Sequence, residues 1–248
     1  SLINKNTVIL TEDPSYSVAT NCFQRAGARI ETVPMEHDGP DLNAVREKLF
    51  KFPIDFYYTM PNFHCPTNVS WSREKRRELL SLAQEYGFVM IEDDCLGEFS
   101  FHYAEHRAFR WEDTTDSVIY LNSFSKCLVP GLRLGYMLVP GRYEKKLILA
   151  KFSTDIASPA ILQETLALYI QRGLYDAHLT ALRSVYAEKR RCMMNAIQKY
   201  RHLSLPYPEH DGGVFFWVRL PEEIDASELW GRLHHQNIKL LHSAVFSH

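Results

Sequence analysis

The sequence is poor in features that mark several common classes of protein. Its 248 residues include only five cysteines, an odd number without a CxxC pair, and its eleven histidines form no HExxH motif. This scarcity excludes a disulfide framework and a familiar zinc motif, and it indicates the reduced thiols of a cytoplasmic protein. We therefore expect no metal site.

Strong net charge and long apolar runs are lacking as well. The formal net charge is −2 and there is no basic stripe or recognition helix, so we expect no nucleic-acid contact from this segment. No apolar run approaches the roughly 18 residues of a membrane-spanning helix. The opening SLINKNTVIL lacks the charged and apolar parts of a signal peptide, and we expect no membrane association.

What the chain does contain is a regular alternation of apolar strands and helices in its first half. The expected strands cover residues 7–10, 28–34, 55–60, 88–93, 117–124 and 132–140, and the expected helices cover 16–26, 41–50 and 70–87. Ser72 is placed to cap the start of the last of these helices, and Gly87 to end it.

Several of these strands, such as FVMIED (88–93), are almost continuously apolar. Such runs are typical of strands buried on both faces, as in a parallel sheet with helices on each side. The alternation therefore predicts the α/β class, with a mostly parallel sheet covered by helices.

The second half of the chain has a different pattern. Helices are expected over 159–200 with an interruption near Gly173, then a strand over 213–220, a helix over 226–236 and a last strand over 238–243. This order predicts a smaller C-terminal α+β domain. We place the large domain at 1–174 and the small one at 175–248.

Distinctive polar residues follow the strands of the first half. Tyr16 follows the first strand and residues 61–68 the third; Asp93 and Asp94 end the next, and Ser123, Ser125 and Lys126 follow the one after. Ligands of open α/β sheets bind at the carboxyl ends of strands. The sequence therefore predicts one site that collects these side chains.

The chemistry of this set points to a phosphorylated aldehyde. The amine of Lys126 can form a Schiff base, while two hydroxyls and the nearby Arg133 can bind a phosphate monoester. An aspartate at a strand end can pair with a protonated ring nitrogen, and Tyr16 can stack on the ring. A lysine, a phosphate cradle and an acidic partner are what pyridoxal 5′-phosphate (PLP) requires.

An alternative use of the lysine is the SxxK motif of serine β-lactamases, matched by Ser123 to Lys126. In those enzymes, SDN and KTG motifs follow and the serine begins a helix. Here neither motif occurs, and Pro130-Gly131 would interrupt the helix. The PLP interpretation is therefore favoured.

The stretch SFSKCLVPGLRLGY resembles the lysine motif of the fold-type I PLP-dependent aminotransferases of class I/II. EDPSY, PNFHCPTN, FVMIEDD and GGVFFW resemble further landmarks of that family, in the expected order. The similarity extends over nearly the whole chain. It is closest to the branch with 2-aminoadipate and kynurenine aminotransferases and the aminotransferase-like domains of GntR/MocR-type regulators.

This resemblance implies a PLP-dependent aminotransferase that moves an amino group between an amino acid and a 2-oxo acid through a Schiff base on Lys126. Asp93 would hold the pyridine nitrogen protonated, and Tyr16 would stack on the ring. The phosphate would be held by Ser123, Ser125 and Arg133. Family members are usually homodimers, so a homodimer is expected. Asp94 stays open as the alternative partner of the ring.

Departures from the family pattern keep two other interpretations open. The family's Asn-Pro-Thr-Gly is Cys65-Pro66-Thr67-Asn68 here, and its tyrosine after the aspartate is replaced by Cys95-Leu96. Both usual donors to the cofactor's phenolic oxygen are thereby lost. The family's N-terminal phosphate-binding turn and C-terminal substrate arginine are also expected to lie outside this segment. The alternatives are a PLP-binding effector domain of a GntR/MocR-type regulator and a weakly active remnant.

Overall fold

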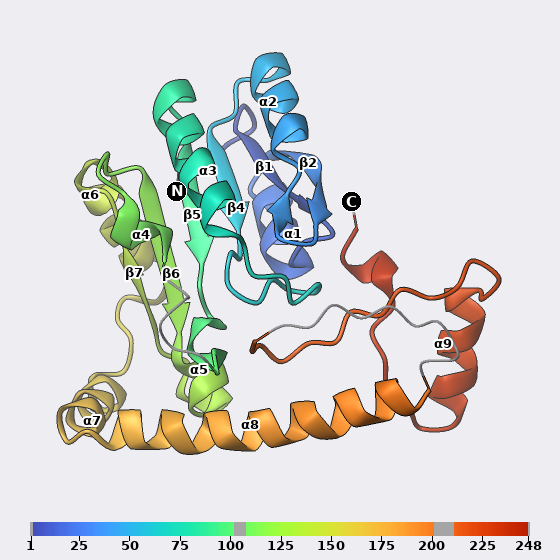
Figure 1. Cartoon of the computed structure of the whole chain (residues 1–248). Coiled ribbons are helices and arrows are strands. Elements are labelled where there is room, and N and C mark those ends of the chain that lie inside the picture. Colours follow the sequence, from blue (N-terminus) through green and yellow to red (C-terminus); the bar gives the residue numbers. More distant parts are fainter. Residues whose placement is uncertain (1, 102–107, 201–210, 248) are drawn as a thin grey trace.

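A single seven-stranded sheet forms the centre of the molecule, with the order β3-β2-β1-β4-β5-β6-β7 (Figure 1). The computed structural model describes residues 2–101, 108–200 and 211–247. The five adjacent strands β2, β1, β4, β5 and β6 run parallel to one another. The edge strands β3 and β7 are antiparallel to their neighbours. The strands are β1 (Val8–Asp13), β2 (Arg29–Glu36), β3 (Gly39–Pro40), β4 (Phe56–Thr59), β5 (Val89–Asp93), β6 (Val118–Ser123) and β7 (Gly135–Leu138). The predicted mostly parallel α/β sheet is confirmed.

Helices connect the strands and cover the sheet. They are α1 (Ser17–Arg25), α2 (Leu42–Lys51), α3 (Arg73–Tyr86), α4 (Phe109–Glu112), α5 (Phe124–Cys127), α6 (Gly141–Asp155), α7 (Ala160–Gln171), α8 (Leu174–Lys199) and α9 (Ala226–His235), with short 3-10 turns η1 (Gly97–Phe99), η2 (Pro130–Leu132) and η4 (Ser243–Val245). The predicted caps of α3 are confirmed: the Ser72 hydroxyl accepts from the Lys75 N–H, and Gly87 ends the helix with a left-handed φ of 76°. Helix α6 was not predicted.

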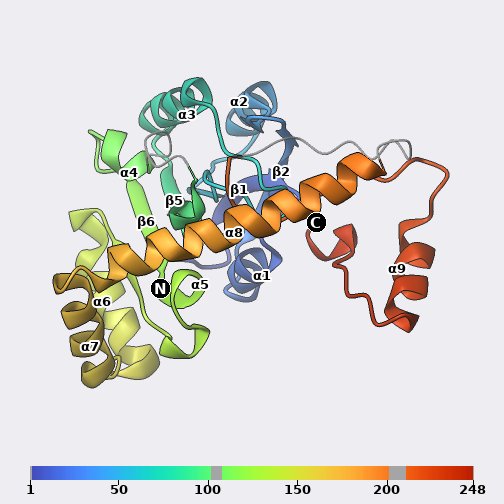
Figure 2. The same cartoon turned by 60° about the horizontal axis from the view of Figure 1, so that its bottom comes forward.

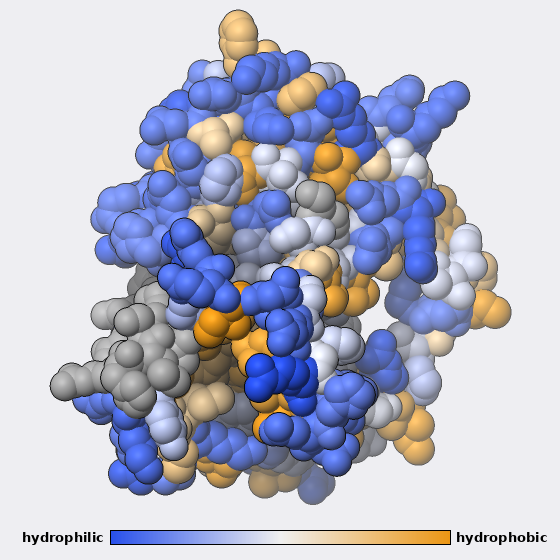
Figure 3. Space-filling model, turned by 90° about the vertical axis from the view of Figure 1, so that its right-hand side faces the viewer, coloured by the Kyte–Doolittle hydropathy of each residue, from blue (hydrophilic) through white to orange (hydrophobic). Residues whose placement is uncertain are grey.

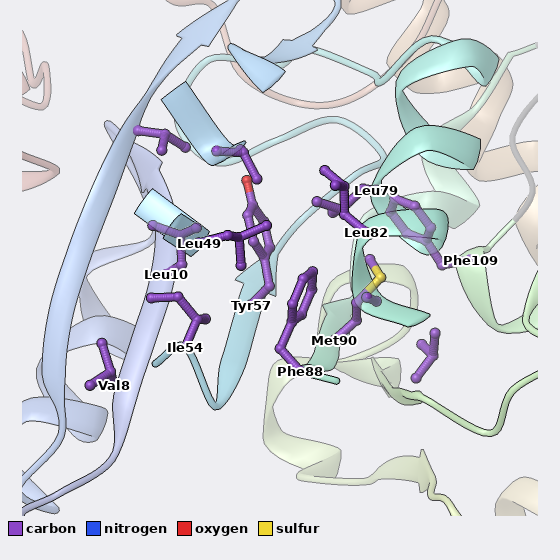
Figure 4. Close-up of a cluster of buried hydrophobic side chains, with 14 of the residues drawn as sticks. Val8, Leu10, Leu49, Ile54, Tyr57, Leu79, Leu82, Phe88, Met90 and Phe109 are labelled. Carbon is purple, nitrogen blue, oxygen red and sulfur yellow. The ribbon is translucent and has the colours of Figure 1, made fainter. Parts of the chain in front are cut away.

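Two hydrophobic clusters lie on opposite faces of the sheet. One packs Leu10, Tyr57 and Met90 against α2, α3 and α4 (Figure 4). The other packs alternate residues of the same strands, such as Ile9 and Tyr58, against side chains from α1, α8 and the C-terminal segment. Successive side chains of a strand point to opposite faces, so strands with a cluster on each face must be almost continuously apolar.

The parallel strands bring their carboxyl ends to one edge of the sheet. Strand β5 pairs with β6 so that Asp93 lies opposite Leu121, and the Asp94 N–H donates to the Leu121 carbonyl at 2.9 Å. Helix α5 begins directly after β6, at the same edge. Residues at the ends of β1, β4, β5 and β6 are therefore available to form one site.

The regular elements of the described C-terminal part are all helical, and residues 211–225 and 236–242 are irregular. The predicted break near Gly173 is confirmed, since α7 ends before it and α8 begins after it. The strands predicted over 213–220 and 238–243 are wrong, because these described residues contain no strand. Val214, Phe215 and Trp217 instead pack on the second cluster. An apolar run becomes a strand only where a neighbouring strand offers its hydrogen-bonding groups.

Helix α8 crosses the molecule along the edge where α5 lies, from α7 toward α9 (Figures 1 and 2). Beyond it, apolar side chains such as Trp230 and Leu241 remain exposed, and the view onto this end shows apolar residues among hydrophilic ones (Figure 3). None of the helices in the described ranges is long and apolar enough to cross a membrane.

Candidate functional site

Lys126 lies on the one-turn helix α5 at the end of β6. Ser123 caps this helix, its hydroxyl accepting the Ser125 N–H at 3.2 Å. Lys126 itself is exposed. In the part of the chain that the structure describes, its amine pairs with no carboxylate. A one-turn helix therefore presents a solvent-accessible amine beside the two predicted serines.

Arg133 is held close to the same strand end. It follows η2, which packs against α5, and adopts a left-handed φ of 51°. The carbonyl of the next residue, Leu134, accepts the Phe124 N–H at 3.1 Å and so ties this turn to the start of α5. Arg133 is exposed and, among the described residues, pairs with no carboxylate. The structure thus brings a second unpaired cation to the end of β6.

Asp93 ends β5, next to β6. The Tyr58 hydroxyl donates to its Oδ2 at 3.0 Å, and the Cys95 N–H donates to its Oδ1 at 3.3 Å. Burial raises the pKa of the Asp93 carboxyl, and these hydrogen bonds oppose the rise. The carboxylate is therefore fixed in direction by groups on two elements, while its residue remains partly accessible.

Tyr16 precedes α1 and lies on the same side of the sheet as Asp93. Burial raises the pKa of its hydroxyl, and the next causes are the nearby Cys95, Asp93 and Cys65. These electrostatic neighbours place Tyr16, the end of β5 and the loop after β4 in one region. The predicted ring-stacking residue is thus brought to the predicted carboxylate.

Two thiols face this region. Burial raises the pKa of Cys65 to about 12 although nearby Lys126 lowers it. Burial and the adjacent Asp93 raise the pKa of Cys95, and the charge of Lys126 opposes this rise as well. Both thiols are therefore protonated at neutral pH and are weak hydrogen-bond donors beside the lysine. Both departures from the family pattern therefore lie close enough to Lys126 to feel its charge, within the candidate site.

Asp94, the alternative carboxylate, is buried in a hydrogen-bond network beneath the site. Asn62 donates to its Oδ1 at 2.7 Å, and the Tyr120 hydroxyl donates to its Oδ2 at 2.8 Å. Arg76 donates to the Asn62 oxygen at 2.6 Å, and Asn122 donates to the Tyr120 hydroxyl at 2.8 Å. Both oxygens of Asp94 are used, so its carboxylate links the loop after β4 to the ends of β5 and β6.

The sequence interpretation missed these supporting residues. Tyr58, Asn62 and Tyr120 lie in or just after apolar strands and are almost fully buried. A polar group in such a position needs a buried partner, because burial without a hydrogen bond is costly. Polar residues in or beside apolar strands therefore indicate a buried hydrogen bond, although the sequence does not show which residue is the partner.

Asn68 stands where the family's loop motif has a glycine, and it adopts a left-handed backbone conformation. Its φ is 62°, a region that asparagine tolerates better than most residues with a side chain. Its amide donates to the Gly212 carbonyl at 3.0 Å. The Asn68 side chain therefore attaches the loop after β4 to the C-terminal segment.

The groups assembled here fit PLP at three of its functional groups and not at the fourth. The accessible amine of Lys126 suits the aldehyde, unpaired Arg133 with two serines suits the phosphate, and the oriented carboxylate of Asp93 suits the ring nitrogen. The phenolic oxygen would meet the protonated thiols of Cys65 and Cys95.

The sheet order and the lysine-bearing turn after β6 define a class, the fold-type I PLP-dependent transferases. Kynurenine aminotransferase from Pyrococcus horikoshii superposes with a TM-score of 0.93 at 28% identity, covering 99% of this chain and 62% of that one. The α-aminoadipate aminotransferase LysN from Thermus thermophilus gives 0.92 at 32% identity, covering 99% and 64%. Residues 1–247 match aminotransferase class I and II, and the chain belongs to this family.

Curated relatives include both enzymes and regulators. The 2-aminoadipate transaminase of Thermus thermophilus is 32% identical over 98% of this chain and 62% of its own length. The uncharacterized HTH-type transcriptional regulator YcxD of Bacillus subtilis is 31% identical over 96% of this chain and 54% of its own. The chain spans about half to three fifths of the curated relatives that it matches.

Proposed function

We propose that this chain is part of a PLP-dependent aminotransferase that moves an amino group between an amino acid and a 2-oxo acid. The observation that carries the proposal is the pair of unpaired cations, Lys126 and Arg133, at the end of β6, beside the oriented carboxylate of Asp93. PLP-complexed relatives such as LysN, solved with a phosphopyridoxyl-leucine adduct, support the choice of cofactor.

Each predicted residue then has a definite task. When bound, PLP supplies an aldehyde for covalent attachment and a ring that accepts electrons from the substrate. Lys126 Nζ would attach to the cofactor and take up the proton from the substrate Cα. The guanidinium of Arg133, with the hydroxyls of Ser123 and Ser125, would hold the phosphate. Asp93 would keep a proton on the ring nitrogen, and Tyr16 would cover one ring face.

Assembly and location are further parts of the proposal. Exposed apolar residues on α6 and α7, including Phe152 and Ile161, support a homodimer because water-exposed patches of this kind favour association. All five cysteines are free, which supports a cytoplasmic protein. The domains are proposed at 1–174 and 175–248, supported by the first hydrophobic cluster, whose residues all precede α8.

The proposal is tested first by attachment of PLP to Lys126 and then by transamination. PLP is added, its visible absorption is recorded, and the adduct is reduced with borohydride and mapped by mass spectrometry. We expect the label on Lys126 and none in Lys126→Ala, with the exposed Lys189→Ala as control. Labelling of another lysine would contradict the assignment. Amino-acid-dependent conversion to pyridoxamine phosphate, over a panel of donors, then tests transamination.

An effector domain of a GntR/MocR-type regulator is the second candidate. Two observations favour it: the thiols of Cys65 and Cys95 where donors to the phenolic oxygen are expected, and the matches to HTH-type regulators such as YcxD. A domain that senses PLP or an amine needs attachment more than turnover. Attachment at Lys126 without pyridoxamine phosphate formation, in a longer version of the chain, would favour this candidate over the enzyme.

A further inference from the structure

Helix α5, which carries Lys126, is too short to hold its own shape. It has one turn, and a single turn fixes several backbone angles for very few hydrogen bonds. Its start is secured by Ser123 and by the bond from Phe124 to Leu134. The position of its end, at Cys127, must come from contacts with another element.

That element is α8. The Nε2 of His178 lies 2.8 Å from the carbonyl oxygen of Cys127. A carbonyl only accepts, so the ring nitrogen must carry the hydrogen and donate. The hydroxyl of Tyr175 lies 3.2 Å from the Cys127 sulfur, and its ring meets Phe124 edge-on at 5.8 Å between centroids. The residues on both sides of the Ser125-Lys126 pair are thus held from α8.

The same face of α8 also holds the segment after Asp93. Arg183 donates to the carboxylate of Glu98 at 2.9 Å and to its carbonyl at 2.8 Å, and Tyr186 meets Phe99 edge-on at 5.0 Å. Contacts at 175, 178, 183 and 186 share one helical face. Because a helix is stiff along its axis, α8 sets the spacing between the Lys126 turn and the segment that follows Asp93.

We propose that His178 is a positioning residue for Lys126, acting through the carbonyl of Cys127, with Tyr175 assisting through the Cys127 sulfur. Its effect on cofactor attachment rests on the proposed function; its effect on the Lys126 turn does not. Without the bond from His178, α5 can unwind at its end, and the amine samples positions away from Asp93.

The experiment compares His178→Leu, which removes the donor, with His178→Gln, whose amide can donate to the same carbonyl. Exposed His235→Leu on α9 is the matched control. Hydrogen exchange of residues 124–128 is measured in each variant without PLP. In parallel, the rate of PLP attachment to Lys126 is followed by borohydride trapping and mass spectrometry.

For His178→Leu we expect exchange of 124–128 to accelerate, and attachment to slow, by about five- to tenfold, the size of one lost hydrogen bond. His178→Gln and His235→Leu should remain within about twofold of the unmodified protein. Should the leucine variant fold poorly, Tyr175→Phe, which removes only the hydroxyl, is expected to accelerate the same exchange by about twofold or more.

Two results would overturn the proposal: unchanged exchange and attachment in both His178→Leu and Tyr175→Phe, or equal losses in His178→Gln and His178→Leu. The exchange measurement also separates this proposal from the proposed function. If the unmodified protein takes no PLP at Lys126 while His178→Leu still loosens 124–128, the cofactor assignment fails and the positioning role stands.

Discussion

The two sides of the candidate site are built from different chemistry. The charged side, at the ends of β5 and β6, contains Asp93, Lys126 and Arg133. The thiol side, in the loop after β4 and the turn after β5, contains Cys65 and Cys95, both protonated through burial. Charges fix where a cofactor attaches, whereas good donors at its phenolic oxygen control its tilt and protonation. The contrast therefore predicts attachment with slow chemistry.

The largest expected effect separates the two carboxylates that end β5. Asp93→Asn should slow the half-reaction on the order of a hundredfold, because it removes a charge that stabilises the reacting ring. Asp94→Asn should chiefly lower the free energy of unfolding, by about 1–3 kcal/mol, since Asn62 and Tyr120 lose their shared charged acceptor. Single-turnover spectra and urea unfolding measure both. A greater loss of chemistry in Asp94→Asn, at unchanged stability, would reverse the assignment.

Arg133 tests the phosphate contact on the charged side. Arg133→Gln removes the charge while keeping a side chain of similar backbone preference at this left-handed position. PLP affinity should weaken by about 1.5–3 kcal/mol, as for a lost charged hydrogen bond. A titration of the visible band gives the value, with exposed Arg172→Gln as control. Equal affinity in both variants would remove Arg133 from the site.

The thiol side is tested by restoring the usual donors. Cys65→Asn and Cys95→Tyr should each tighten PLP by about 1 kcal/mol, roughly fivefold, because an amide or phenol donates better than a buried thiol. The half-reaction should accelerate together with binding. Cys192→Ser, at an exposed cysteine on α8, is the control. If both changes weaken PLP, the thiols contact something other than the phenolic oxygen.

The smallest effect concerns Glu92, which lies under the charged side. Burial, and then Asp94, raise the pKa of its carboxyl to about 8, although the N–H groups of Phe109 and Arg110 oppose the rise. In the unfolded chain a glutamate titrates near 4.3. The folded state therefore retains a proton that the unfolded state releases, and the free energy of unfolding falls as pH rises from about 4.5 to 8.

Glu92→Gln replaces the carboxyl with an amide that does not titrate, so this pH dependence should disappear. Relative to the unmodified protein, its unfolding free energy should rise by about 1 kcal/mol between pH 7 and pH 8, on top of a constant loss because the amide nitrogen cannot accept one of the two N–H bonds. Urea unfolding at several pH values measures the change, and exposed Glu222→Gln provides the baseline. A constant difference across this range would show that Glu92 stays ionised in the folded protein.

Local patterns in the sequence were enough for six of the seven described sheet strands, all but the two-residue β3, and for most of the helices. Apolar runs such as 88–93 and 117–124 became β5 and β6. Ser72 caps the start of α3 and Gly87 ends it, as predicted. These features depend on neighbours within a few residues, where side-chain spacing and caps act directly. The lysine motif was recognisable for the same reason, because Ser123, Ser125 and Lys126 lie on one short turn.

Only the tertiary structure decided how distant residues share the site. Asp93 and Asp94 are adjacent in sequence, yet Asn62 and Tyr120 occupy both oxygens of Asp94 while Tyr58 orients Asp93. His178 reaches Cys127 across 51 positions of the chain. The strand expected over 213–220 did not form, because a ladder needs a partner strand and packing on the second cluster took its place. A residue type states which bonds it can make, but long-range packing selects the partner.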